Sequence, residues 1–295
     1  MTATNEGRLC WGIYRELAHS PGRETDDALI LQAVARRLSG DGFDVELKST
    51  EDLPGSGDGE PPSFVFVMCE RGDALDRLAV WEASGACVIN AVSGIRNTYR
   101  DRTLPLLEAA GVSLPRSALV RTTETALLGP AGGERALAGL WVKRGDVHNT
   151  EAGDVLRAGT PAEVIAALGA FSRRGIGTAL LQEHAEGDLV KFYGVGSDAA
   201  SGEASWFEWF YHRDQVLLRH PFDTARLRAI ARRAAAALGL EIWGGDAIVS
   251  ASGDILLIDL NAWPSFALYL ERAAQHIAAH LAARFRKHVR TGVAE

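Results

Sequence analysis

The sequence predicts an α/β (α+β) fold that begins with a small parallel sheet and its crossover helices. In the first third of the chain, apolar strand-like runs alternate with segments of helical periodicity. Strands that alternate with helices in this way form βαβ units with parallel strands. The chain has 295 residues, which is more than one small core accommodates, so we expect two or three packed units.

The elements of the first third follow from these patterns. The expected helices are 27–38 and 74–82, and Thr25 and Asp26 are capping candidates for the first of them. A loop rich in glycine and proline separates the second and third strands at 53–62. The expected strands are 9–14, 43–47, 63–69 and 86–90.

The remaining two thirds contain both strands and helices. A helix over 100–110 ends at Gly111, and residues 112–120, with Pro115, lead into a new unit. Further helices are expected at 161–171, 224–238 and 266–289. Strands are expected at 138–143, 179–183, 189–195 and 205–211, with another option at 215–218 and two strands between 242 and 261.

Composition and charge exclude several classes of protein. A formal net charge of -7 argues against non-specific nucleic-acid binding, which needs a basic surface. Three cysteines without paired spacing, Cys10, Cys69 and Cys87, indicate buried thiols rather than a disulfide framework or a zinc site. Because the sequence has no apolar signal core and no run of about 20 apolar residues, we expect a cytoplasmic protein that does not span a membrane.

The most informative stretch is a hairpin with carboxylates, which runs from residue 244 to residue 261. If Ser252 and Gly253 form a two-residue turn, Asp246 faces Asp259. Asn261 then shares their side of the sheet, because strand side chains alternate with a period of two. A three-residue turn would instead put the two aspartates on opposite faces.

Two facing carboxylates are costly unless a cation lies between them. At about 5 Å they repel by roughly 3 kcal/mol at an effective dielectric constant near 20, and like charges directly opposed destabilise a sheet. The oxygen ligands of Asp246, Asp259 and Asn261 suit Mg²⁺ or Mn²⁺, and such a site implies a phosphate ligand. The alternative is that Asp246 caps a strand end and Asp259 pairs with an arginine.

Two lysines lie in apolar strands. Lys143 ends the run Leu140–Val142, and Lys191 lies within 189–193. Lysines at half-buried strand positions need a counter-charge, which a triphosphate would supply. The alternative is that each lysine extends its ammonium group to the surface.

Four stretches occur in an order that resembles ATP-grasp enzymes. They are CVINAVSGIRNTYRDRTLPLLEAAGVSLP, LWVKRGD, LLQEHAEGDLVKFYGVG and LGLEIWGGDAIVSASGDILLIDLNAWP. The sequence is most similar to the branch that contains RimK-type ligases, synapsin-like proteins and inositol trisphosphate kinases, over about residues 86–266. The resemblance implies an N-terminal pre-ATP-grasp domain (1–95) and an ATP-grasp domain (96–295) of two α+β subdomains, a lid at about 112–182 and a C-terminal subdomain at about 183–295.

The resemblance also implies roles for individual residues, with ATP and Mg²⁺ (or Mn²⁺) as cofactors. Asp246, Asp259 and Asn261 would hold the metal ions. Arg102 follows Asp101 where the family usually has Asp-Lys, so it would replace a phosphate-binding lysine. The family's γ-phosphate arginine has no clear equivalent, and Arg213 and Arg219 are the candidates. The other nucleotide contacts would come from Lys143 at the phosphates, Gln182, Glu183 and His184 at the hinge, Asp188 at the ribose, and Lys191 near nucleotide or substrate.

Substrate residues are expected in two places. Arg15, His19 and Arg23 follow the first strand, and loops at the carboxyl ends of parallel strands bind ligands; the alternative is a solvated loop. Ser265 lies where relatives carry loops on the substrate side.

The resemblance implies an ADP-forming ligase that joins a small-molecule or peptide carboxylate to an amine. The alternatives are a small-molecule kinase of the inositol phosphate kinase type and an ATP-binding regulatory protein without turnover. We expect no nucleic-acid or membrane partner, and a homodimer remains an option.

Overall fold

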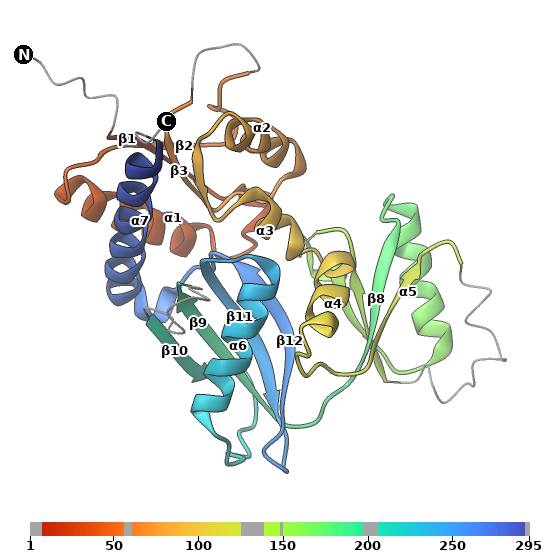
Figure 1. Cartoon of the computed structure of the whole chain (residues 1–295). Coiled ribbons are helices and arrows are strands. Elements are labelled where there is room, and N and C mark those ends of the chain that lie inside the picture. The colour runs from red at the N-terminus through yellow and green to blue at the C-terminus, as the bar shows by residue number, and fades with distance from the viewer. Residues whose placement is uncertain (1–7, 56–60, 125–138, 148–149, 197–205, 293–295) are drawn as a thin grey trace, which may run out of the picture.

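The computed structural model describes residues 8–55, 61–124, 139–147, 150–196 and 206–292. These residues form three four-stranded sheets, which Figure 1 shows as an N-terminal sheet, a sheet packed against α6, and a sheet packed against α5. Residues 138 and 205, predicted as strand ends, and the middle of the predicted loop 53–62 lie outside the described residues. No helix of the described residues combines the length and apolar character needed to cross a membrane.

The N-terminal sheet is parallel, as predicted. Its order is β2 (Asp44–Lys48), β1 (Leu9–Ile13), β3 (Phe64–Val67) and β4 (Cys87–Ile89). Side chains alternate between its faces. One face packs against α1 (Glu24–Gly40) and α7 (Leu270–Gly292), and the other against α2 (Gly72–Ala83) and α3 (Val92–Asn97).

The ends of two predicted helices were wrong. Helix α1 begins at Glu24 after the N-cap residue Arg23, so Thr25 and Asp26 lie inside its first turn. The last helix begins at Leu270 after a short 3-10 helix, η7 (Ala267–Tyr269), because Phe266 adopts a φ of 52°, outside the helical region. A second short 3-10 helix, η2 (Leu17–His19), follows β1.

The second sheet is antiparallel, with the order β10 (Trp206–Tyr211), β9 (Asp188–Val195), β11 (Ile242–Val249) and β12 (Ile255–Ala262). Helix α6 (Thr224–Leu238), which begins and ends where the sequence predicts, covers one face (Figure 1).

The optional strand at 215–218 does not form. The Gln215 side chain bonds the N–H and C=O of Leu189 at 2.8 and 2.6 Å, and the N–H of Leu218 donates to the Asp188 carboxylate at 2.7 Å. Hydrogen bonds that involve side chains therefore hold this segment beside the start of β9, and no strand pairing forms.

The third sheet is antiparallel and lies beyond α4 (Arg100–Ala109). Its order is β5 (Ser117–Arg121), β8 (Thr178–Glu183), β6 (Leu140–Arg144) and β7 (Val155–Ala158). Helix α5 (Pro161–Arg173) packs on it, and a 3-10 helix, η6 (Ala152–Asp154), precedes β7. Strand β7 was not predicted, because its four residues are too short to show a clear alternation.

The buried side chains form three cores. One combines β3, β4, α2 and α3 with α6, β11 and β12, and another combines α1 and α7 with residues of β9, β10 and β11. Residues before and after the predicted domain boundary at residue 95 thus contribute side chains to the same two cores. The third core belongs to the β5-β8-β6-β7 sheet and α5, so this unit is held to the rest of the chain by fewer buried contacts.

Two close contacts fix the N-terminal sheet against the second sheet. The buried Asn90 side chain accepts hydrogen bonds from the N–H groups of Glu241 and Ile242 and donates to the Ile242 carbonyl, at 2.8 to 2.9 Å. At Gly94 a Cβ atom would lie 2.6 Å from the Gly239 carbonyl oxygen at the end of α6. Any larger residue at position 94 must push α3 away from α6.

We therefore expect Gly94→Ala to lower the free energy of unfolding by about 1–3 kcal/mol, the usual cost of overpacking. Urea titration followed by circular dichroism measures this change. Gly72→Ala is the matched control, because no atom lies within 4 Å of a Cβ at that helical position. Equal stability of the Gly94 and Gly72 variants would contradict the proposed contact.

Candidate active site

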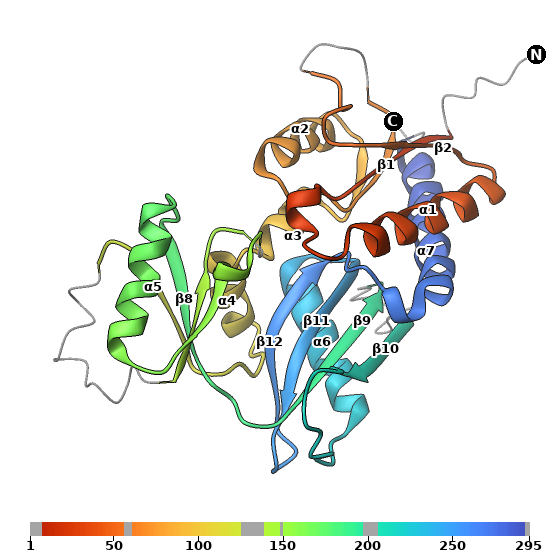
Figure 2. The ribbon, with the colours of Figure 1, turned by 180° about the vertical axis from the view of Figure 1, so that it is seen from behind.

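A cleft of about 510 Å³ lies between the second and third sheets. Its walls come from β6, β11 and β12, from Arg100 on α4, and from the linker that joins β8 to β9. Figure 2 shows this linker crossing from one sheet to the other. Because the third sheet has its own core, the two walls belong to units that are packed independently.

The predicted pair of aspartates faces each other, although the predicted turn was wrong. The Ser250 N–H donates to the Asp254 carbonyl at 2.9 Å, so the loop between them has three residues, 251–253. A three-residue loop by itself would put the two aspartates on opposite faces of the sheet. A β-bulge between the Asp246 and Ala247 pairings shifts the register by one, and Asp246 pairs with Asp259 and Gly244 with Asn261.

Cationic side chains surround this acidic pair. The Lys191 ammonium donates to both carboxylate oxygens of Asp246, at 2.8 and 3.0 Å. The Arg100 guanidinium lies 3.4 Å from the Asp259 carboxylate and is 4% exposed as a residue. Burial raises the pKa of the Asp246 carboxyl, and Lys191 opposes that shift. Each of the two carboxylates is thus paired with a cationic side chain, Asp246 with Lys191 and Asp259 with Arg100.

Lys143 is buried and lies beside the acidic pair. Its ammonium donates to the Gln182 side-chain oxygen at 2.9 Å and to the Ile258 carbonyl at 3.3 Å. Burial lowers its pKa to about 8, and Asp259 opposes the shift. The Gln182 amide also donates to Ser117 at 3.1 Å, which fixes the orientation of its oxygen toward Lys143.

The predicted hinge residues line the cleft. Gln182, Glu183 and His184 all contribute to its wall. The Trp141 indole N–H donates to Nδ1 of His184 at 3.1 Å, and Nε2 of the same ring lies 3.2 Å from Glu186. Gly187 follows, and a Cβ atom there would lie 2.1 Å from the Val249 carbonyl oxygen. Only glycine lets the linker run this close to β11.

Of the arginines on α4, Arg100 rather than Arg102 reaches the cleft. Arg102 is exposed, whereas Arg100 lines the cleft and donates to the Arg144 carbonyl at 3.1 Å. A pattern in the sequence could have found it. Arg100 shares one helical face with the buried Leu104 and Leu107, and Arg102 lies on the opposite face.

Asp188, which the resemblance places at the ribose, does not line the cleft. Its side chain is fully buried, and its two oxygens accept hydrogen bonds from the N–H groups of Leu218 and His220, each at 2.7 Å. The carboxylate therefore holds the segment before α6. Two other acidic side chains line the cleft, Glu183 at the end of β8 and Glu186 in the linker.

Arg213 and Arg219 do not reach the acidic pair. Both are exposed, and neither lines the cleft. Arg219 has a positive φ of 56°, within the segment that Asp188 holds. The structure therefore does not place either arginine at the cleft, where a γ-phosphate contact would require it.

The predicted substrate residues lie around the end of β12, outside the cleft. Arg15 donates to the Trp263 carbonyl at 2.6 Å and forms an ion pair with Glu70 at 3.0 Å. Nδ1 of His19 lies 4.0 Å from Glu70, and the exposed Arg23 pairs with Asp26 at 3.1 Å. The Ser265 side chain hydrogen-bonds the Tyr193 hydroxyl, whose pKa burial raises to about 12.

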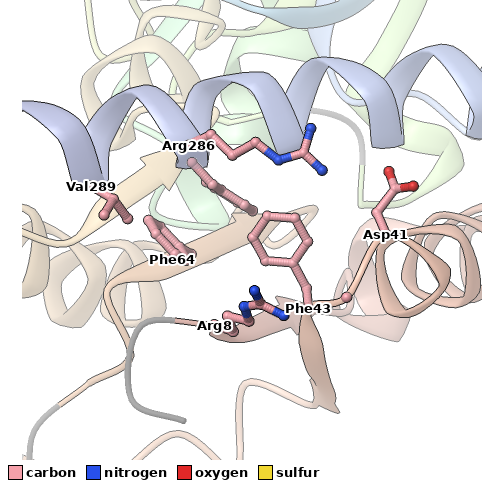
Figure 3. Close-up of a pocket in the computed structure, with 8 residues that line it drawn as sticks. Arg8, Asp41, Phe43, Phe64, Arg286 and Val289 are labelled. Carbon is pink, nitrogen blue, oxygen red and sulfur yellow. The ribbon is translucent and has the colours of Figure 1, made fainter. Parts of the chain in front are cut away.

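Another hollow, of about 550 Å³, lies at the amino ends of β1, β2 and β3 (Figure 3). Phe64 and Phe285 stack in its floor with ring centroids 4.6 Å apart, and Arg8 and Arg286 stand at its rim. Arg15, which contacts β12, follows the opposite end of β1. This hollow is therefore separate from the acidic pair.

A metal ion would need ligands beyond these side chains. The described residues contain no group of three or more His, Cys, Asp or Glu side chains that could hold a metal ion. Two carboxylates and the Asn261 amide instead suit an ion that keeps water or phosphate oxygens in its coordination shell, as Mg²⁺ does. The buried cations Lys143 and Arg100 beside the pair suit an anion at the same place.

Comparison with solved structures shows a common architecture. The D-Ala:D-Ser ligase VanG from Enterococcus faecalis has a TM-score of 0.70 and 14% identity, over 94% of this chain and 99% of that chain. The ATP-grasp ligase PsnB, complexed with a minimal precursor, Mg and ADP, has a TM-score of 0.61 and 17% identity, over 97% and 99%. A RimK domain ATP-grasp protein from Sphaerobacter thermophilus has a TM-score of 0.64 and 17% identity, over 93% and 99%. No family model and no curated protein matches the sequence.

The contacts of Asp188 lead to a test of its structural role. We expect Asp188→Ala to lower the free energy of unfolding by about 3 kcal/mol, because two backbone N–H groups lose a charged acceptor in a buried place. Asp188→Asn should lie between Asp188→Ala and wild type, since one amide oxygen replaces two carboxylate oxygens. Urea titration measures both, and wild-type stability of Asp188→Ala would exclude this role.

Proposed function

Because the chain has the ATP-grasp fold, we propose that it is an ATP- and Mg²⁺-dependent ligase that joins a carboxylate to an amine. One observation carries the proposal. The facing Asp246 and Asp259 lie in the same cleft as the buried cations Lys143 and Arg100. Opposite charges gathered in one cleft suit a metal–triphosphate complex, which carries both signs of charge.

The cleft offers suitable surroundings for each part of ATP. Trp141, Leu189 and Ile248 give it an apolar portion beside the linker, where an adenine ring would pack and the backbone of Glu183 and His184 would bond its edge. Glu186 would accept the ribose hydroxyls in place of Asp188. Lys143 and Arg100 would contact the phosphates, and Asp246, Asp259 and Asn261 would hold Mg²⁺.

A bound metal–phosphate complex would change the charge balance among the residues of the cleft. Lys191 contacts both oxygens of Asp246 at 2.8 and 3.0 Å, so a metal ion at Asp246 requires Lys191 to give up at least one of these bonds. The released ammonium would then be available to phosphate or substrate. The phosphates would also give Lys143 a negative counter-charge in addition to the partial one from the protein's own groups.

Mg²⁺ supplies charge neutralisation of the phosphates, and the chain supplies position. In the proposed reaction a substrate carboxylate oxygen would attack the γ-phosphorus, and ADP would leave. The amine would then attack the acyl carbon of the acylphosphate, inorganic phosphate would leave, and the nitrogen would lose a proton. Lys143 and Arg100 would stabilise the charge that develops on the phosphate oxygens.

The charge of the cleft favours a ligase over a kinase of phosphorylated substrates. Such a kinase needs a dense cluster of lysines and arginines for its acceptor. Among the described residues that line the cleft, the lysine and arginine side chains are Arg100 and Lys143, and the acidic ones include Glu183, Glu186 and Asp214. The substrate would be a small-molecule or peptide carboxylate, and the cytoplasmic location expected from the sequence remains a prediction.

We expect Asp259→Ala to abolish Mg²⁺-dependent ADP formation and to leave the fold intact, because in this proposal the side chain is a metal ligand and not part of a core. A coupled ADP assay with carboxylate and amine libraries, and mass spectrometry of the products, measures turnover. Asp254→Ala is the control, since this aspartate lies exposed in the turn of the same hairpin. Wild-type turnover of Asp259→Ala would remove Asp259 from the site.

ATP binding should take up protons near pH 8. The pKa of Lys143 is lowered to about 8 by burial, so about half of the free protein carries a neutral lysine at that pH. Bound phosphates favour the ammonium form. Uptake should therefore be clear at pH 8 and small at pH 6.5, where Lys143 is already protonated.

Calorimetry of ATP binding in two buffers of different ionisation enthalpy measures the number of protons taken up. Lys143→Arg is the comparison, because an arginine stays charged across this range. If the variant takes up as many protons as wild type at pH 8, another group titrates and the assignment to Lys143 fails.

A further inference from the structure

Helix α6 carries four arginines on its solvent side. Leu227, Ala231 and Leu238 face the core, while Arg226, Arg228 and Arg233 are exposed and Arg232 is half-buried. In the described part of the chain, none of these four arginines forms an ion pair, defined as a nitrogen within 4.0 Å of a carboxylate oxygen. This concentration of positive charge occurs in a chain whose formal net charge is -7.

Strand β10 presents a free edge beside this helix. It is the end strand of its sheet and pairs only with β9 in the described part of the chain. The His212 N–H donates to the Leu189 carbonyl at 3.0 Å, in the register of the strand pair. Because bonded pairs alternate along antiparallel strands, Phe207, Trp209 and Tyr211 direct their N–H and C=O groups to the free side.

The basic side of α6 and the free edge adjoin each other. The Arg228 guanidinium lies over the Phe207 ring, 5.4 Å from its centroid. A hollow of about 380 Å³ separates β10 from the first half of α6, and Trp209 and Arg228 lie in its wall. Arg232 follows Arg228 by one helical turn on the same side, and its buried Nε has no hydrogen-bond partner.

We propose that this surface, formed by the free edge of β10 and by Arg228 and Arg232 of α6, binds an acidic peptide segment in an extended conformation. The edge offers main-chain donors and acceptors that an added strand satisfies. Carboxylates on one face of that strand pair with the two arginines, of which Arg228 lies in the wall of the hollow. The proposal does not depend on the chemistry of the cleft.

A peptide fits these features better than a nucleic acid does. The backbone groups of an edge strand are matched by another polypeptide backbone. Nucleic-acid binding takes most of its affinity from a broad basic surface.

The test measures binding of a fluorescein-labelled decapeptide of alternating glutamate and threonine by fluorescence anisotropy at low salt. We expect saturable binding to the intact protein. Arg228→Glu combined with Arg232→Glu should weaken it at least tenfold. The control combines Arg36→Glu with Arg286→Glu, which changes the net charge equally at exposed positions of α1 and α7, and it should bind within twofold of wild type.

A second peptide of the same sequence, with every backbone amide N-methylated, separates strand addition from simple charge attraction. It keeps every carboxylate and cannot pair along an edge, so it should bind at least fivefold more weakly. Circular dichroism confirms that each variant is folded. The proposal is overturned by no saturable binding of the first peptide, by equal affinity of the methylated peptide, by equal losses in the two double variants, or by tighter binding of single-stranded DNA of the same charge.

Discussion

The arrangement of charge in the cleft depends on the repulsion between Asp246 and Asp259. Two carboxylates on neighbouring strands destabilise a sheet unless cations offset them. Lys191 and Arg100 each contact one of them, and the buried Lys143 lies close enough for Asp259 to oppose the shift of its pKa. These cations come from β9, α4 and β6, so the same electrostatic requirement draws three parts of the chain to one point.

Packing explains why a cleft exists at this point. The N-terminal sheet and the second sheet share two cores. Hydrogen bonds of Asn90 and the close approach of α3 to α6 at Gly94 hold the two sheets together. The third sheet has a core of its own. Lys143 therefore belongs to a unit that is packed separately from the one that carries Asp246 and Asp259. A nucleotide bound between them would connect the two units through phosphate and metal contacts.

The same sheet presents two further surfaces. The face of the sheet away from α6 carries the acidic residues, α6 carries arginines on its solvent side, and β10 leaves a free edge beside them. Asp188 connects these regions, because it lies at the start of β9 and holds the segment that leads to α6. A residue that the resemblance placed at the nucleotide thus supports the scaffold.

The sequence by itself determined the order of the elements, the parallel N-terminal sheet and the bounds of α6, and it indicated the hairpin that carries two aspartates and Asn261. These features follow from local periodicity and from residues close together in the hairpin. Only the tertiary structure decided that a bulge restores the aspartate pairing after a three-residue loop, that Arg100 rather than Arg102 enters the cleft, and that Asp188 bonds the segment before α6. Each of these depends on contacts between residues that lie on separate elements or on a single irregularity in a strand. The alternation of side chains along the chain carries no information about either.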